Sequence, residues 1–133
     1  MNEFLWPVRV YWEDTDAGGV VYYANYLRFL ERCRSEWLRS RGLSQQALAS
    51  DRGVQFMVLE VKIVYRAPAR LDDSLVVSCA MQPEGRTTVR FVQQIWRGEP
   101  RATAAELLLD AEVRVVCVDA KTLRPRRIGE YLS

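Results

Sequence analysis

Residues 24–41, with the sequence ANYLRFLERCRSEWLRSR, carry a strong helical hydrophobic period. The apolar side chains recur at the spacing i, i+3, i+4, i+7, i+11 and i+12, and Gly42 follows as a typical residue just past a helix C-terminus. The arginines and glutamates between them fall on other faces of the same helix. The stretch predicts one amphipathic helix over 24–41, and its apolar stripe comprises Tyr26, Phe29, Leu30, Cys33, Trp37 and Leu38.

Beyond this helix the hydrophobic period becomes alternating. Ser44 is a suitable N-cap for a short helix over about 44–51. After Gly53, four segments alternate apolar and polar residues, at 59–65, 75–81, 89–95 and 109–117. In the first of them, Leu59, Val61, Ile63 and Tyr65 belong to the phase that we expect to be buried. Turn-forming residues lie at 83–86 and 97–100.

Residues 4–12 resemble a first strand, with Pro7 suited to a sheet edge. The predicted order is therefore strand, helix and then a meander of four strands. We expect an α+β fold in which the helix packs on one face of a five-stranded antiparallel sheet. The chain of 133 residues is predicted to form a single domain over 1–133.

Composition narrows the class of protein. Apolar residues make up 49% of the chain and charged residues 27%, which is typical of a globular domain. No apolar run is long enough to span a membrane, and the first residues lack the pattern of a secretory signal. Cys33, Cys79 and Cys117 are far apart in sequence, on apolar phases, and are expected to be core thiols. We therefore expect a cytoplasmic protein.

The chain contains no histidine. This excludes catalysis by a histidine base and metal sites built on histidine. The net charge of +2 is small, and the arginines are scattered, so a nucleic-acid module is disfavoured. Chemistry must therefore come from carboxylates, tyrosines, lysines, cysteines or backbone amides.

The segment before the helix concentrates such groups. Residues 11–26 read YWEDTDAGGVVYYANY, with three carboxylates within four residues and two glycines behind them. An EF-hand calcium loop beginning at Asp14 would need glutamate at its twelfth position, where the chain has Asn25, so no metal site is predicted. The acids have two remaining interpretations: they stabilise the helix N-terminus, or they serve catalysis.

The catalytic interpretation rests on two chemical groups. A helix N-terminus offers free N–H groups that polarise a carbonyl oxygen, and a nearby carboxylate attacks that carbonyl or activates a water. A carboxylate is a weak base, so an ester with a good leaving group, such as a thioester, suits it. Gly18 and Gly19 would allow a substrate to approach the backbone closely.

Residues 14–26, DTDAGGVVYYANY, together with 65–73, YRAPARLDD, and 112–119, EVRVVCVD, resemble a known family. The chain is similar to the hotdog-fold acyl-CoA thioesterases of the 4-hydroxybenzoyl-CoA thioesterase group, above all to the type associated with the Tol–Pal system. The resemblance covers nearly the whole chain. It implies a five-stranded antiparallel sheet wrapped around one long central helix. It also implies a homotetramer built as a dimer of dimers, with active sites at subunit interfaces.

The resemblance further implies roles for individual residues. It places the catalytic carboxylate at Asp16 and the oxyanion donor at the backbone N–H of Tyr23, and it implies no metal or organic cofactor. It implies acyl-CoA as substrate, with CoA phosphates near the hairpin that holds Arg86; a solvated Arg86 is the alternative. The Tol–Pal type usually carries histidine where this chain has Tyr23, which leaves the backbone role intact and the acyl preference open.

Several other candidates each have two interpretations. Tyr22 and Tyr23 would line an acyl pocket or pack in the core, and packing is favoured for Tyr26. Asn25 would position substrate or cap the helix, with capping favoured. Glu13 and Asp14 are expected to organise the loop, and Asp72 and Asp73 to form a turn.

Four functional hypotheses are compared for this sequence. A thioesterase is favoured. A hotdog dehydratase is disfavoured because that branch uses histidine. A non-catalytic module that binds acyl-CoA or an acyl carrier protein is the alternative, and a nucleic-acid module is the weakest.

Overall fold

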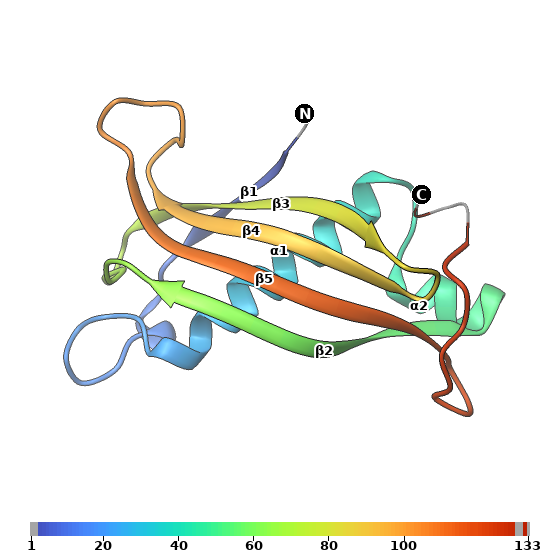
Figure 1. Ribbon diagram of the computed structural model, residues 1–133. Coiled ribbons are helices and arrows are strands. Elements are labelled where there is room, and N and C mark those ends of the chain that lie inside the picture. The colour runs from blue at the N-terminus through green and yellow to red at the C-terminus, as the bar shows by residue number, and fades with distance from the viewer. Residues whose placement is uncertain (1–2, 130–131, 133) are drawn as a thin grey trace.

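The computed structural model describes residues 3–129 and 132 (Figure 1). One α-helix lies against a five-stranded antiparallel sheet that curves around it. The elements, in chain order, are β1 Phe4–Arg9, the 3₁₀ turns η1 Trp12–Asp14 and η2 Tyr23–Asn25, α1 Tyr26–Ser40, α2 Gln45–Ala47, the π turn η3 Leu48–Arg52, β2 Val54–Tyr65, β3 Ser74–Glu84, β4 Thr88–Arg97 and β5 Glu106–Asp119.

The long helix follows the predicted stripe. All six predicted apolar residues of α1 are buried, and Trp37 meets Phe91 of β4 edge to face at 5.4 Å between ring centroids. Gly42 ends the helix with a φ of 79°, in the left-handed region that glycine adopts without cost. The predicted start at residue 24 is early, because residues 23–25 form a 3₁₀ turn before α1 begins.

The predicted meander of four consecutive strands is only partly correct. The sheet order is β1-β3-β4-β5-β2, so β3, β4 and β5 are neighbours in sequence and in space, whereas β2 pairs with β5 at the far side. Residues 66–73 carry the chain from one edge of the sheet to the other, where β1 pairs with β3. An alternating pattern defines the faces of a strand but contains no information about its neighbour. The first strand also ends earlier than predicted, at Arg9.

Strand β2 is an edge strand, and most of its apolar residues from Met57 to Tyr65 are exposed, although Ile63 is half-buried against the core. The predicted burial of Leu59, Val61 and Tyr65 is wrong: their exposed fractions are 54%, 40% and 47%. Met57, Val58 and Val64 of the same strand are at least 40% exposed as well. The strand has a bulge between Val58 and Glu60 opposite β5, and its free edge has no neighbouring strand among the described residues. The pattern correctly indicated a strand but not which surface covers it.

The remaining predicted features are mostly confirmed. The β3–β4 hairpin turns at Gly85, with a φ of 78°, whereas the β4–β5 connection spans 98–105 and is longer than the predicted turn. The three cysteines are buried and unpaired. A hydrogen bond with Cys79, followed by burial, raises the pKa of the Cys33 thiol, so it stays neutral in the core. No helix in the described part of the chain is long and apolar enough to cross a membrane.

Candidate active site

The loop between β1 and α1 is organised around Asp14. This residue is buried, and its Oδ2 accepts a hydrogen bond from the backbone N–H of Tyr11 at 2.8 Å. Its backbone carbonyl accepts from the N–H of Tyr22 at 3.0 Å and from the side-chain amide of Asn25 at 2.9 Å. Asp14 therefore organises the loop, as predicted, and holds both ends of it together.

Asn25 does not cap the helix. It adopts helical backbone angles, and its side chain makes no capping hydrogen bond. Its amide instead donates to Asp14, as described above, and this bond fixes the loop against the first turn of α1. The favoured prediction of a capping role is thus wrong, because the 3₁₀ turn η2 places Asn25 inside the helical segment rather than at its boundary.

Asp16 lies at the exposed tip of this loop. Its backbone N–H donates to Val20 at 2.9 Å and its carbonyl accepts from Gly19 at 3.0 Å, which closes a tight turn. Its side-chain Oδ1 accepts from the N–H of Gly18 at 2.8 Å. Among the described residues, no hydrogen bond reaches Oδ2. One oxygen of the carboxylate is thus held by the turn, while the other makes no hydrogen bond to the described residues.

The two glycines support this turn in different ways. A Cβ atom on Gly18 would come within 3.2 Å of Asp16 Oδ1, so a side chain there would crowd the carboxylate. Gly19 has a φ of 78°, a conformation that side chains rarely adopt. Both glycines therefore shape the surroundings of Asp16.

The start of the helical segment offers backbone donors. Tyr23 and Ala24 are the first residues of η2, and within the described residues neither N–H has a hydrogen-bond acceptor. This is the usual state of N–H groups at a helix N-terminus, where they interact favourably with negative charge. The rings of Tyr22 and Tyr23 are exposed beside them, 4.9 Å apart between centroids.

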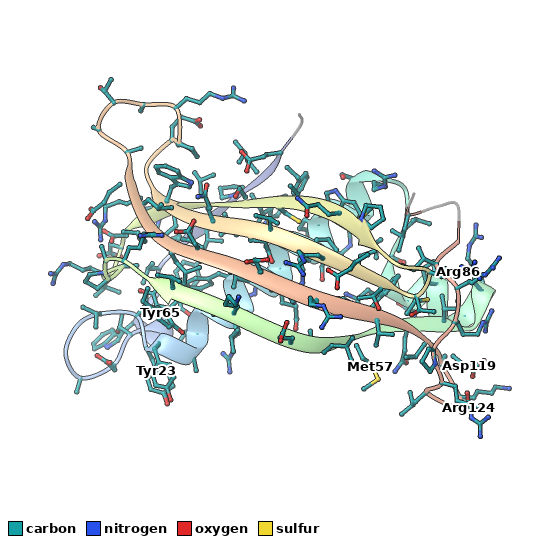
Figure 2. All side chains as sticks on the ribbon, in the orientation of Figure 1. Tyr23, Met57, Tyr65, Arg86, Asp119 and Arg124 are labelled. Atoms are coloured by element: carbon teal, nitrogen blue, oxygen red, sulfur yellow. The ribbon has the colours of Figure 1, made fainter. Side chains whose placement is uncertain are left out.

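Tyr65, at the end of β2, contacts the same region (Figure 2). Its hydroxyl donates to the backbone carbonyl of Tyr23 at 3.0 Å. Its ring meets that of Tyr26 edge to face at 5.6 Å. The sequence placed Tyr65 on the buried phase of a strand and gave no signal of this contact.

Tyr26 connects the helix to the segment that follows β2. Its hydroxyl oxygen is a buried acceptor for the N–H of Ala69 at 3.0 Å. Burial raises the pKa of this hydroxyl, and the charges of Asp73 and Asp16 raise it further. Tyr26 is a packing residue, as predicted.

Arg86 is not part of this cluster in one chain. It lies in the exposed β3–β4 turn, at the opposite end of the sheet from Tyr23 and Tyr65 (Figure 2). Asp72 and Asp73 form the predicted turn, with Asp72 at a φ of 69° and Asp73 Oδ2 accepting from the N–H of Arg70 at 2.8 Å.

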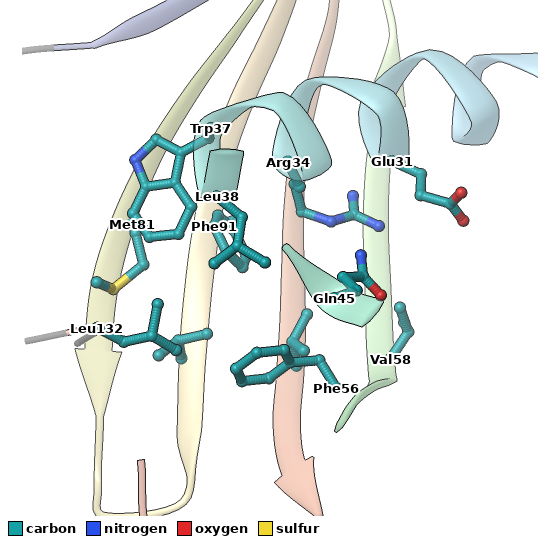
Figure 3. A pocket seen from close by; sticks show the side chains of 12 residues that line it. Glu31, Arg34, Trp37, Leu38, Gln45, Phe56, Val58, Met81, Phe91 and Leu132 are labelled. Atoms are coloured by element: carbon teal, nitrogen blue, oxygen red, sulfur yellow. The ribbon is translucent and has the colours of Figure 1, made fainter. Parts of the chain in front are cut away.

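An apolar hollow of about 180 Å³ lies under the C-terminal half of α1 (Figure 3). Arg34 lines it together with Glu31 and Gln45, and the Nη1 of Arg34 donates to Gln93 Oε1 at 3.0 Å. Burial lowers the pKa of Arg34. None of the residues that line the hollow belongs to the Asp16 loop; they include Trp37, Phe56, Met81, Phe91 and Leu132.

A metal has no evident ligands here. In the part of the chain that the structure describes, no three side chains among histidine, cysteine, aspartate and glutamate come together as a metal site would require. What the loop brings together is one exposed carboxylate, two open amides and a group of tyrosines.

The family model of the thioesterase superfamily matches residues 18–104. The chain belongs to the thioesterase superfamily. Similar proteins match the chain along almost its full length. It is 49% identical over 129 residues to the acyl-CoA thioester hydrolase YbgC of Escherichia coli O6:H1, and the match covers 97% of this chain and 92% of that protein. It is 42% identical over 124 residues to the acyl-CoA thioesterase YbgC of Haemophilus influenzae, covering 93% and 87%.

Solved structures support the same fold. A probable thioesterase from Bartonella henselae superimposes with a TM-score of 0.87 at 33% identity, covering 96% of this chain and all of that one. A 1,4-dihydroxy-2-naphthoyl-CoA thioesterase from Synechocystis gives a TM-score of 0.87 at 25% identity, covering 98% and 92%. The predicted resemblance to hotdog thioesterases is confirmed.

Proposed function

We propose that this protein hydrolyses acyl-CoA thioesters to the free acid and CoA, with Asp16 as the catalytic carboxylate. One observation carries the proposal: an exposed carboxylate with one unengaged oxygen lies in the same loop as open amides at a helix N-terminus. The names of the relatives support the same reaction.

The chemistry follows from the two groups. The thioester carbonyl oxygen accepts a hydrogen bond from the N–H of Tyr23, and negative charge that develops on this oxygen is stabilised by the helix N-terminus. Such a donor is typically worth about 3 kcal/mol in the transition state. The free Oδ2 of Asp16 then either attacks the carbonyl carbon or removes a proton from a water that attacks it.

Atoms and charges are conserved both when Asp16 attacks the thioester and when it activates a water. In the first, the C–S bond breaks as the Asp16–acyl bond forms, CoA leaves as a thiolate that takes up a proton, and water hydrolyses the mixed anhydride. In the second, the attacking water supplies the hydroxyl of the acid, and its proton passes through Asp16 to the CoA sulfur. Labelled water distinguishes them, because only the first route brings label into the Asp16 side chain over repeated turnovers.

The surrounding residues take supporting roles in this proposal. Gly18 and Gly19 allow the thioester to approach the backbone, while the rings of Tyr22 and Tyr23 border the acyl group. Asn25 acts through Asp14 by holding the loop, which makes it a positioning residue rather than a substrate contact. Because Tyr23 contributes its backbone N–H, the loss of an imidazole at this position leaves the polarising role unchanged.

The β2 edge supports a dimer. An edge strand with several exposed apolar residues is a surface that soluble proteins normally cover. Two copies joined by antiparallel pairing of their β2 strands would bury Leu59 and Val61 of both. The two copies would be related by a two-fold axis, as in most homodimers. Assembly into a dimer of dimers, a cytoplasmic location and an association with the Tol–Pal system stay predictions.

A non-catalytic module that binds acyl-CoA or an acyl carrier protein is the alternative, because this chain has tyrosine where the nearest family type has histidine. Release of free thiol from a panel of aliphatic and aromatic acyl-CoAs decides between them. Turnover of at least one thioester that is lost in Asp16→Asn supports the enzyme. Tight binding without turnover of any thioester supports the module and overturns the enzyme.

A further inference from the structure

The crossover of residues 66–73, which connects β2 to β3, lies directly against the loop between β1 and α1. The N–H of Val21 donates to the carbonyl of Ala69 at 2.9 Å, and Ala69 is fully buried. Val20, the preceding residue of the loop, forms an antiparallel bridge with Arg70. The crossover therefore holds this loop through backbone contacts at two consecutive residues.

These two contacts lie between the groups that the proposed reaction uses. Both valines stand in sequence between Asp16 and Tyr23. The carbonyl of Val20 also accepts a hydrogen bond from the N–H of Asp16 at 2.9 Å. A shift of the crossover would therefore change the distance between the Asp16 carboxylate and the N–H of Tyr23.

Arg97, the last residue of β4, fixes the crossover from its other side. Its Nε donates to Asp73 Oδ2 at 3.0 Å, and its Nη2 donates to the carbonyl of Pro68. The same oxygen of Asp73 accepts a hydrogen bond from the N–H of Arg70 at 2.8 Å. Arg70 is the residue that pairs with Val20, and it stands in sequence between the two partners of the guanidinium. One side chain thus fixes the crossover on both sides of its contact with the loop.

The guanidinium of Arg97 bonds a different partner with each of its three nitrogens. Its Nη1 pairs with Glu106, which lies opposite Arg97 in β5. The Arg97 side chain is 31% exposed and that of Asp73 is 21% exposed, so solvent screens their ion pair only partly. Lysine has a single nitrogen at the end of its chain and cannot bond three partners in one plane. The arrangement therefore requires arginine rather than a positive charge alone.

We infer that Arg97 is a positioning residue of the proposed thioesterase: by fixing the crossover, it sets the distance between the Asp16 carboxylate and the Tyr23 N–H. The inference rests on the proposed function and extends it to a side chain that acts through Pro68 and Asp73. Strands β4 and β2 end at the same end of the sheet, beside the Asp16 loop (Figure 1). A small misplacement of reacting groups lowers the rate of the chemical step even where the substrate still binds.

The test compares Arg97→Lys with Arg90→Lys. Arg90 belongs to the same strand, its guanidinium pairs with Glu84 and Glu112, and its side chain is 37% exposed. These two partners lie in β3 and β5 rather than in the crossover. Both substitutions keep the charge and remove a guanidinium with several partners, so we expect similar losses in the free energy of unfolding, measured with urea.

The kinetic constants separate positioning from stability. Thiol release from an acyl-CoA is measured well below the temperature at which either variant unfolds. We expect kcat to fall about tenfold in Arg97→Lys, with KM close to the wild-type value. Arg90→Lys should retain the wild-type kcat and KM. An unchanged kcat in Arg97→Lys would overturn the inference, and so would equal losses of kcat in the two variants.

Glu106→Gln tests which contacts of Arg97 matter. This substitution removes the charge beside Nη1, whereas Nε and Nη2 keep their bonds to Asp73 and Pro68. We therefore expect a wild-type kcat in Glu106→Gln. A kcat that falls as far in Glu106→Gln as in Arg97→Lys would contradict a role through the crossover.

Amide hydrogen exchange tests the contact without hydrolysis. The N–H of Val21 is held by Ala69, so its exchange should become severalfold faster in Arg97→Lys and stay at the wild-type rate in Arg90→Lys. If the protein hydrolyses no thioester while exchange changes in this way, the proposed function fails, although Arg97 does fix the loop. An active enzyme in which Arg97→Lys changes neither the exchange nor kcat overturns the inference and leaves the proposed function standing.

Discussion

The hydroxyl of Tyr65 donates a hydrogen bond to the backbone carbonyl of Tyr23 at 3.0 Å, which fastens the end of β2 to the start of the helical segment. This carbonyl belongs to the peptide that carries the N–H of Ala24, one of the two open amides. The contact joins the exposed edge strand to the donors of the candidate site.

Tyr65→Phe removes this hydrogen bond and keeps the ring. Because the bond is solvent-exposed, we expect a loss of about 0.5–1 kcal/mol in the free energy of unfolding. Since the donors are then held less firmly, kcat should fall severalfold. Urea unfolding and steady-state kinetics measure the two effects. An unchanged kcat alongside reduced stability would restrict Tyr65 to a structural role.

Asn25→Asp replaces the amide donor with a second acceptor at the same shape. The bond to the carbonyl of Asp14 is then lost, and a negative charge is added close to it. We expect about 1–2 kcal/mol lower stability and a lower kcat. Asn25→Gln, with a longer amide, should recover part of both. Full activity in Asn25→Asp would mean that the hydrogen bond between the Asn25 amide and the Asp14 carbonyl does not position the loop.

The fold could be predicted from the sequence where one physical pattern dominates. The stripe from Tyr26 to Leu38 predicted α1, and the alternating segments predicted β3, β4 and β5. The position of β2 beside β5 could not be predicted, since periodicity carries no information about strand order.

In the candidate site, too, local sequence patterns were informative and contacts between distant residues were not. The helical period predicted a helix start at residue 24, two residues before α1 begins at Tyr26, whereas the roles of Asp16 and Tyr23 were implied by the family resemblance. Contacts between distant residues left no local signal: Tyr65 lies 42 residues from Tyr23, and the hydrogen bond between Ile128 and Arg86 joins the C-terminal segment to a hairpin. The exposure of β2 also contradicted its pattern, because alternation marks a strand but does not indicate which surface covers it.

Leu59→Lys tests the proposed dimer through β2. A charge placed on the apolar edge should be incompatible with a buried interface, so we expect monomers in sedimentation velocity. Leu123→Lys is the control, because Leu123 is 50% exposed, close to the 54% of Leu59, and lies outside β2. An assembly that survives Leu59→Lys rules out β2 as the interface.

Tyr26 predicts a dependence of stability on pH. Its hydroxyl has a raised pKa in the folded chain, so the unfolded chain loses its proton first, near pH 10. Above that pH, unfolding releases a proton, and the free energy of unfolding must fall as pH rises. Tyr26→Phe cannot titrate, so its stability should fall less steeply between about pH 9 and 11.

Both proteins retain the shifted cysteine thiols, so the difference between their curves reports on Tyr26 and on its electrostatic contribution to the raised pKa of Tyr65, which comes first from burial. At neutral pH, Tyr26→Phe should be less stable by about 1 kcal/mol, since the N–H of Ala69 loses its acceptor. If the free energy of unfolding depends on pH in the same way in both proteins, the Tyr26 hydroxyl does not contribute to the pH dependence of stability.

Asp16→Asn is the decisive variant for the proposed chemistry. Asparagine retains an oxygen that can accept from Gly18, so the turn should persist, while the nucleophile or base is lost. Glu13→Gln, in the same loop, is the control for the loss of an exposed acidic charge. The measurement is kcat for thiol release from the best acyl-CoA of the panel. We predict a fall of about 10²-fold or more in Asp16→Asn and little change in Glu13→Gln; equal kcat values for Asp16→Asn and wild type would show that Asp16 is not the catalytic carboxylate.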